Sequence, residues 1–288
     1  MLVYSLARAA RPHQWVKNLL LFVPILSSSQ SLNEVLVIGL WIFVTLCMVS
    51  SSIYLINDII DSSDDALHPI KSKRPVASGE LPIPYAFIFA LSLIATANIL
   101  CIILKLPIQN LINLYFCYSL AYTVFIKKIF FLDVLSLAFF FSFRVFIGAI
   151  GFGLGSSIWL LSFIFTIFLS IACIKRLGEL AIGFKSLKRY YSEDHKRTLE
   201  IISITSFILS LAILFLYFKA PKLNEVFEYA SFLIFSIPII VIWYMRMLKL
   251  SKQGKIPSDP VAFAIKDSQS IILFICLVLI YIIAYYGI

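Results

Sequence analysis

Long apolar stretches alternate with short polar connectors along the whole chain. An α-helix needs about 20 apolar residues to cross a bilayer. Stretches of that length, or nearly so, lie at about 16–33, 35–56, 84–104, 109–126, 129–152, 156–174, 200–218, 229–248 and 268–287. The first is the weakest, because it contains Pro24 and a run of serines. The pattern predicts an all-α fold, an integral membrane bundle of nine transmembrane helices that forms a single domain over residues 1–288.

Basic residues are concentrated in every second connector. Of the 24 Lys and Arg residues, twenty lie in the N-terminal segment up to Lys17 or near and beyond the ends of the second, fourth, sixth and eighth stretches, with seven of them between 175 and 197. Three follow the other stretches, and Arg144 lies inside one. Cytoplasmic connectors are enriched in Lys and Arg. We therefore expect a multi-pass protein of a bacterial-type cytoplasmic (inner) membrane, with its N-terminus cytoplasmic and its C-terminus external.

The composition agrees with a membrane protein. The chain is 61% hydrophobic and 14% charged, whereas soluble domains are about 45–50% apolar and about 25% charged. The net charge of +9 does not indicate nucleic-acid binding, because the one-sided distribution of Lys and Arg already accounts for it. The five cysteines are scattered through apolar stretches, which argues against a disulfide framework or a cysteine metal site.

One connector, NDIIDSSDDALHPIKSKRPVASG at 57–79, is rich in charge of both signs. If the preceding helix continues into it, Asp58, Asp61 and Asp65 share one face within about 60° of arc, with Asn57 adjacent and Asp64 off that face. Like charges at this spacing repel, and clustered carboxylates suit Mg²⁺ shared with substrate phosphates. The alternative is a solvated acidic connector without a ligand.

Cations follow the carboxylates directly. Lys71 and Arg74 lie between Pro69 and Pro75, which stop helix formation, and Gly79 is placed to close a turn. A cation pair beside a metal-binding acidic face is suited to a polyphosphate, because the metal and the cations can take different oxygens.

Further polar residues lie near the predicted cytoplasmic ends of other stretches. They are Arg11, Trp15, Lys17 and Asn18 in RPHQWVKN, Tyr122, Lys127, Asp133, and Lys175, Arg176 and Glu179 in CIKRLGEL. Arg144 is eleven residues beyond Asp133, a rise of about 16 Å, so the two cannot pair directly. A charge inside a span needs a partner or a wet cavity, which makes Arg144 a candidate site residue. The basic residues also fit simple anchoring at the inner leaflet.

The motifs resemble the UbiA superfamily of intramembrane prenyltransferases, and NDIIDSSDD resembles its NDxxDxxxD motif. The likeness is nearest to the decaprenyl-phosphate phosphoribosyltransferase branch and rests on RPHQWVKN, YLINDIIDSSDDALHPIKSKRPVASG, AYTVFIK, KRLGEL and DPVAFAIKD. It implies a Mg²⁺-dependent transferase that moves 5-phosphoribose from phosphoribosyl diphosphate to a polyprenyl phosphate for envelope polysaccharide assembly, at the cytoplasmic face. It also implies metal and diphosphate binding by Asn57, Asp58, Asp61 and Asp65, and phosphate binding by Lys17, Asn18, Lys71, Arg74, Tyr122, Lys127, Lys175 and Arg176.

Two other functions stay open. Aromatic prenyltransferases of the superfamily use a polyprenyl diphosphate and carry a second Asp-rich motif after the sixth span, where this chain has KRLGELAIGFKSLKRYYSEDH. A transporter needs charged residues near the bilayer midplane, where only Arg144 qualifies. Polyprenyl length, the polysaccharide pathway and a possible homo-oligomer are not readable from the sequence.

Overall fold

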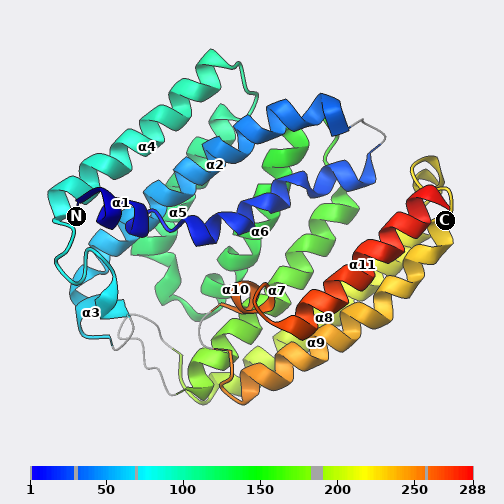
Figure 1. Cartoon of the computed structure of the whole chain (residues 1–288). Coiled ribbons are helices and arrows are strands. Elements are labelled where there is room, and N and C mark those ends of the chain that lie inside the picture. The colour runs from blue at the N-terminus through cyan, green and yellow to red at the C-terminus, as the bar shows by residue number, and fades with distance from the viewer. Residues whose placement is uncertain (1, 29–31, 69–70, 183–190, 257–258, 288) are drawn as a thin grey trace. The chain divides into compact units, whose positions relative to one another are not determined.

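The computed structural model describes residues 2–28, 32–68, 71–182, 191–256 and 259–287 (Figure 1). Regular structure within these ranges is helical throughout. Pro69 lies outside the described residues, as do three of the basic residues counted above between 175 and 197, namely Lys185, Lys188 and Arg189. Gly79 adopts φ 79°, a left-handed conformation that closes the turn as the sequence predicted.

The helices follow one another with short connections. In chain order they are α1 (Leu2–Ala9), the 3-10 helix η1 (Pro12–Ser27), α2 (Leu32–Ile60), α3 (Ser62–Ala66), η2 (Lys71–Lys73), α4 (Ile83–Ile103), α5 (Gln109–Val124), η3 (Ile126–Lys128), α6 (Phe130–Gly151), α7 (Ile158–Ala181), α8 (His195–Phe218), η4 (Pro221–Glu225), η5 (Ala230–Phe235), α9 (Ser236–Lys252), α10 (Pro260–Ala264) and α11 (Ser268–Tyr286).

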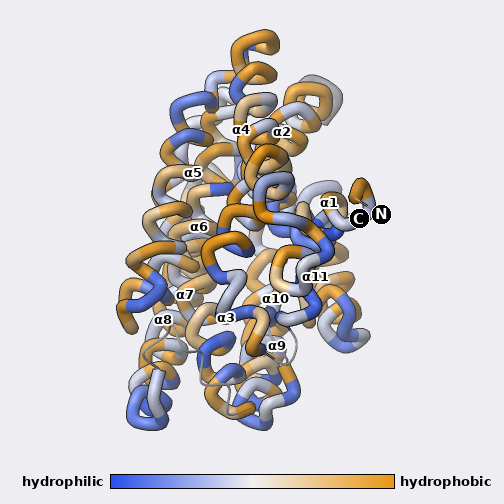
Figure 2. The backbone as a smooth tube through the Cα atoms, turned by 90° about the vertical axis from the view of Figure 1, so that its left-hand side faces the viewer, coloured by the Kyte–Doolittle hydropathy of each residue, from blue (hydrophilic) through white to orange (hydrophobic). Residues whose placement is uncertain are grey.

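Seven helical segments of the described chain are long and apolar enough to cross a membrane: 35–60, 83–103, 130–151, 158–181, 195–218, 230–252 and 268–286. Figure 2 shows hydrophobic residues along most of these helices and hydrophilic residues mainly near the connections. The other two stretches predicted from the sequence, 16–33 and 109–126, fall on helices of 16 residues each, η1 and α5. The protein is thus an all-helical, multi-pass integral membrane protein.

The chain divides into two compact units, while the single domain expected from the sequence stays a prediction. The first unit comprises Met1–Ile25, Gln30–Ile129 and Phe143–Gly155. Within it α2 packs against α4 and α5. Ala86 and Ala90 of α4 are fully buried, and Ser52 Oγ of α2 donates to the Ala90 carbonyl oxygen at 2.7 Å. Small residues at this contact let the two backbones approach closely.

The second unit comprises Leu26–Ser29, Phe130–Ser142 and Ser156–Ile288. Within it α7 packs along α8 and against α9. The buried Phe207 and Tyr244 rings stack with centroids 3.7 Å apart, and Ser203 Oγ lies 3.0 Å from the Tyr244 hydroxyl oxygen. Stacked aromatic rings and a satisfied hydroxyl are favourable in a water-free core.

Candidate functional site

The acidic connector of the first unit continues the helical backbone of α2 with one irregularity. Asp61 lies between α2 and α3 with φ −94° and ψ 3°. The hydrogen bonds nevertheless keep helical spacing, because Asp61 N donates to Asn57 O at 2.9 Å and Asp65 N donates to Asp61 O at 2.8 Å. Asp58 and Asp65 are seven residues apart, almost two helical turns, and therefore point to nearly the same side.

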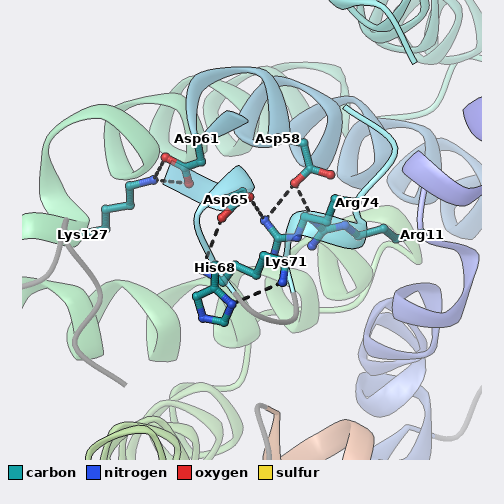
Figure 3. A network of polar contacts seen from close by, with 8 residues as sticks. All are labelled: Arg11, Asp58, Asp61, Asp65, His68, Lys71, Arg74 and Lys127. Carbon is teal, nitrogen blue, oxygen red and sulfur yellow. Dashed lines mark hydrogen bonds and ion pairs between the residues drawn. The ribbon is translucent and has the colours of Figure 1, made fainter. Parts of the chain in front are cut away.

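Arg74 joins those two carboxylates (Figure 3). Asp58 is 1% exposed and Asp65 is 3% exposed. Arg74 Nη1 lies 3.1 Å from Asp58 Oδ1 and also donates to Asp65 Oδ2. Lys71 Nζ lies 3.6 Å from Asp65 Oδ1. The two cations predicted from the connector therefore contact the carboxylates that precede them.

The surroundings of Arg74 act on its guanidinium in opposite directions. Burial lowers the pKa of Arg74, the positive charge of Arg11 lowers it further, and Asp58 and Asp65 raise it. An arginine stays protonated in proteins in spite of such effects. Arg74 therefore serves as a fixed positive charge within the cluster.

Asp61 has a different partner. Lys127 in η3 donates from Nζ to both carboxylate oxygens of Asp61, at 2.8 and 2.7 Å, across 66 residues of sequence. Lys127 is buried, so little water screens this pair. The contact brings the segment that follows α5 to the acidic connector, while the role of Lys127 in phosphate binding stays a prediction.

Arg11 also belongs to the cluster, although it was not among the residues expected to bind phosphate. Its Nη2 donates to Asp58 Oδ1, and its guanidinium lies 5.2 Å from the Tyr54 ring centroid. Arg11 has φ 53°, which is uncommon for a residue other than glycine. Ser51 fixes this corner, since its Oγ donates to Ala10 O at 2.9 Å and accepts from Trp15 Nε1 at 3.0 Å. The stretch RPHQWVKN was the available signal, but it does not reveal the left-handed turn.

The carboxylates fit a hard cation such as Mg²⁺ by their chemistry. Asp58 Oδ2 is buried and has no hydrogen-bond partner, so one carboxylate oxygen of the cluster is unsatisfied. Within the described residues no three His, Cys, Asp or Glu side chains already form a ligand group, because Arg and Lys side chains pair with the carboxylates. Asp58, Asp61 and Asp65 are the residues suited to hold the ion.

Arg144 has an amide as a partner. Its Nε donates to Asn18 Oδ1 at 2.9 Å, and its guanidinium lies 5.3 Å from the Tyr115 ring centroid. Asn18 is buried and also donates from Nδ2 to Cys47 Sγ at 3.3 Å. Asn18 therefore faces the interior of the first unit, while the preceding Lys17 is partly exposed.

The second unit contains a separate buried ion pair. Arg176 donates from Nε and Nη2 to the carboxylate of Asp133, at 2.6 and 2.9 Å, and from Nη1 to Glu179 Oε2 at 2.6 Å. Tyr191 donates its hydroxyl to Asp133 Oδ2 at 2.6 Å. Burial and the charge of Asp133 raise the pKa of Tyr191, which keeps that hydroxyl protonated. Arg176 is 1% exposed, so its guanidinium serves this pair, whereas the neighbouring Lys175 is only partly buried.

Two remaining candidates lie in the first unit. Asn57 in α2 and Tyr122 in α5 are both partly buried. Their roles in diphosphate and phosphate binding stay predictions.

Residues 19–249 match the model of the UbiA prenyltransferase family. The chain belongs to this family. Several solved structures share the UbiA fold with it. A UbiA homolog from Archaeoglobus fulgidus bound to GPP and Mg²⁺ has a TM-score of 0.66 and 15% identity, with 98% of each chain covered. A digeranylgeranylglyceryl phosphate synthase has a TM-score of 0.67 and 14% identity, with 99% of each chain covered.

The curated proteins similar to this UbiA-family chain include a nodulation protein, a phosphoribosyltransferase and an uncharacterized protein. Nodulation protein NoeC of Azorhizobium caulinodans is 29% identical over 273 residues, 92% of this chain and 88% of the relative. Decaprenyl-phosphate phosphoribosyltransferase of Corynebacterium glutamicum is 30% identical over 220 residues, 73% of this chain and 66% of the relative. Uncharacterized protein y4nM of Sinorhizobium fredii is 28% identical over 269 residues. The chain spans about half the length of y4nM, since the match covers 90% of this chain and 52% of that protein.

Proposed function

We propose that this UbiA-family transferase moves 5-phosphoribose from phosphoribosyl diphosphate to a polyprenyl phosphate and releases diphosphate. The observation that carries the proposal is the cluster of the first unit, where ion pairs join Asp58, Asp61 and Asp65 to four cations of the chain. Such a cluster suits a substrate with several phosphate groups, because both metal-binding oxygens and phosphate-binding cations are at hand. The similarity to a decaprenyl-phosphate phosphoribosyltransferase supports the same reaction.

The reaction makes modest demands on the protein. A phosphate oxygen of the polyprenyl phosphate attacks C1 of the ribose, and the bond from C1 to the diphosphate breaks. The phosphate monoester that attacks has a second pKa of about 6 and is largely ionised at pH 7, so no general base is required. When bound, Mg²⁺ would neutralise charge on the leaving diphosphate. Lys71, Arg74 and Lys127 are proposed to contact phosphate oxygens and hold them in place.

The identity of the donor is argued from the end of α7. An aromatic prenyltransferase of the superfamily carries a second carboxylate motif after the sixth span. Here the acids near that position, Asp133 and Glu179, both accept hydrogen bonds from Arg176. The stretch KRLGELAIGFKSLKRYYSEDH at that position begins with cations and has no close pair of aspartates. Its sequence disfavours a second metal site, which supports a donor with a single diphosphate and a separate phosphate. Lys175, beside Arg176, stays the candidate for that second phosphate.

A second candidate is transfer of a prenyl group from a prenyl diphosphate. It is favoured by the fold shared with a UbiA homolog bound to GPP and Mg²⁺ and with a digeranylgeranylglyceryl phosphate synthase. The cluster of the first unit suits any diphosphate, so it does not by itself separate the two donors.

The membrane arrangement is proposed to have nine spans with the site at the cytoplasmic face of the inner membrane. A 3-10 helix rises about 2.0 Å per residue, so sixteen residues of η1 cover about 32 Å, near the thickness of the hydrocarbon core. The sixteen residues of α5 cover about 24 Å. The segment 125–128, which includes η3, lengthens this path.

Lipid extraction after incubation with labelled donors tests the proposal. Purified protein in detergent would receive Mg²⁺, a polyprenyl phosphate and phosphoribosyl diphosphate labelled in the ribose. We expect label in the organic phase, together with release of one diphosphate per labelled lipid. A parallel reaction would contain a labelled prenyl diphosphate and aromatic acceptors instead.

The two reactions separate the candidates. An Asp58→Asn variant, which retains shape but removes the charge, serves as the inactive control. Labelled aromatic product without any labelled phosphoribosyl lipid would replace the first proposal with the second.

A further inference from the structure

Arginine and lysine side chains pair with the three carboxylates that are proposed to bind the metal. Arg11 and Arg74 both donate to Asp58 Oδ1, and Arg74 also donates to Asp65 (Figure 3). Lys127 donates to both oxygens of Asp61. Each carboxylate of the predicted metal set is therefore already neutralised by a side chain of the protein.

The net charge of the cluster affects how a metal ion can bind there. Three carboxylates are paired with four cations, so the charges of these seven side chains sum to about +1. A divalent cation that enters alone makes the cluster strongly positive within a poorly screened, largely buried region. A divalent cation that enters with a diphosphate adds charge of both signs and leaves the sum near zero.

Asp58 shows where an incoming cation would bind. Its Oδ1 accepts from both arginines, whereas its buried Oδ2 has no hydrogen-bond partner. A buried carboxylate oxygen without a partner is costly, and a metal ion would satisfy it.

We infer that Arg11 and Arg74 are exchangeable counter-ions that leave Asp58 and Asp65 for the phosphate oxygens when Mg²⁺ and a diphosphate bind together. Arg11 thereby becomes a phosphate-binding residue, and the metal binds weakly until a diphosphate is present. The inference deepens the proposed function, since it rests on a diphosphate being bound at this cluster. It does not depend on which group the diphosphate carries.

Arg11 is the better of the two arginines for a test. Its guanidinium also lies 5.2 Å from the Tyr54 ring centroid, so it has a contact near the cluster besides the pair with Asp58. Arg74 joins two buried carboxylates, and its loss endangers folding. Arg11→Gln removes the charge and keeps most of the side-chain length, while Arg11→Lys retains the charge.

Thermal unfolding of the detergent-solubilised full chain provides the measurement, because a ligand that binds the folded state raises the unfolding temperature, and a tighter ligand raises it more at the same concentration. Mg²⁺ alone, inorganic pyrophosphate alone and both together would be titrated. For the wild type we expect a clear rise only with both. For Arg11→Gln we expect a rise with Mg²⁺ alone, from an affinity about tenfold or more above wild type, because one competing charge is gone.

The same variant should bind pyrophosphate less well in the presence of Mg²⁺. Loss of one charge-assisted contact is expected to raise the half-saturating pyrophosphate concentration by about tenfold or more. Arg11→Lys should resemble the wild type in both titrations. Arg197→Gln is the control, since Arg197 lies on α8 in the second unit and is exposed. It removes the same charge from a segment outside the cluster and should change neither affinity.

Saturation of the wild type by Mg²⁺ alone, or equal titrations for wild type and Arg11→Gln, would overturn the inference. These outcomes are independent of the labelled-lipid assay. Absence of phosphoribosyl transfer together with linked binding of Mg²⁺ and pyrophosphate would remove the proposed donor and leave the counter-ion exchange intact. Phosphoribosyl transfer together with independent binding of Mg²⁺ and pyrophosphate would support the proposed donor and remove the counter-ion exchange.

Discussion

Asp58 is a buried carboxylate whose two oxygens have different surroundings. Oδ1 accepts from Arg11 and Arg74, and Oδ2 accepts no hydrogen bond. Asp61 and Asp65 each have a basic partner as well. Asp64 lies off their shared side of the helix, so its charge should matter less for a bound diphosphate.

We expect Asp58→Asn to lower the rate of diphosphate release by about a hundredfold or more, because a charged ligand to the metal and to two arginines is lost. Asp64→Asn should retain activity within about tenfold. Initial rates in detergent, with circular dichroism to check folding, would measure both. Equal losses in the two variants would show that the ligands do not follow the helical face.

Arg176 and Lys175 are adjacent but should respond differently to substitution. Arg176→Met leaves Asp133, which is 0% exposed, without its bidentate partner, and breaking a buried pair costs about 3–5 kcal/mol. Lys175→Met removes a charge from a side chain that is only partly buried and should lower the unfolding temperature by less than Arg176→Met does. Thermal unfolding of both variants would be compared. An Arg176→Met protein as stable as the wild type would contradict the structural role of this pair.

Residue spacing in the sequence predicted part of the candidate site, but it did not predict the contacts between distant segments. The spacing of Asp58 and Asp65 predicted a shared face, and both contact Arg74. The bond between Asn18 and Arg144 joins residues 126 apart, and no local pattern encodes such a contact. The sequence placed Arg11 near the same membrane face, but its contact with Asp58 depends on a left-handed backbone turn that no local pattern shows.

At the scale of elements, η1 approaches α6 at a glycine. A Cβ atom added at Gly148 would meet the backbone carbonyl of Leu21 far inside contact distance. We expect Gly148→Ala to force these helices apart and cost about 1–3 kcal/mol, the usual penalty of overpacking. Gly155→Ala is the matched control, because nothing lies within 4 Å of a Cβ there. Unfolding temperatures in detergent should fall only for Gly148→Ala, and an equal response would show that η1 does not pack there.

Asp267 caps α11 and links it to α9 within the second unit. Its carboxylate accepts from Arg246 at 2.7 and 2.8 Å and from Ser270 N at 2.8 Å. The hydrogen bond from Arg246 is the main reason that the pKa of Asp267 falls from 3.8 to about 2. Because the folded pKa is the lower one, the contribution to stability is present above about pH 4 and is lost as pH falls through 2.

Asp267→Asn should therefore lower the unfolding temperature at pH 5, and the difference from wild type should shrink as pH falls toward 2. Unfolding scans of both proteins over that range would measure it. Asp194→Asn, at the start of α8 and on the exposed side of the chain, should show no comparable convergence. A difference that stays constant down to pH 2 would mean that the carboxylate charge does not stabilise the link.

Apolar runs located the helices well, but their geometry needed tertiary structure. The stretch 35–56 corresponds to α2, which extends to Ile60 before the irregularity at Asp61. The stretch 16–33 became a 3-10 helix that contains Pro24. Hydropathy reports burial and length and does not distinguish 3-10 from α geometry, since both satisfy the backbone hydrogen bonds internally.

For the whole molecule, the distribution of charge is the property that sets orientation. Twenty Lys and Arg residues lie in the N-terminal segment and the even-numbered connectors, against three in the others. Moving a basic connector across the membrane is opposed during insertion, so this asymmetry favours a cytoplasmic N-terminus. The prediction requires nine crossings, and therefore requires that η1 and α5 span the membrane in addition to the seven longer segments.

Reporter fusions would test this orientation. A fluorescent protein that matures only in the cytoplasm should be active after Lys128 and after Gly254, and a phosphatase that folds only outside should be active after Gly155 and after Leu223. Fusions on either side of α5 show whether this helix crosses the membrane. Since Lys128 is expected to be cytoplasmic, a fusion after Pro107 should report an external position if α5 crosses. If Pro107 and Lys128 both read cytoplasmic, α5 does not span. That result would not affect the Lys127–Asp61 pair, because both residues lie in the first unit and their contact does not depend on the number of spans.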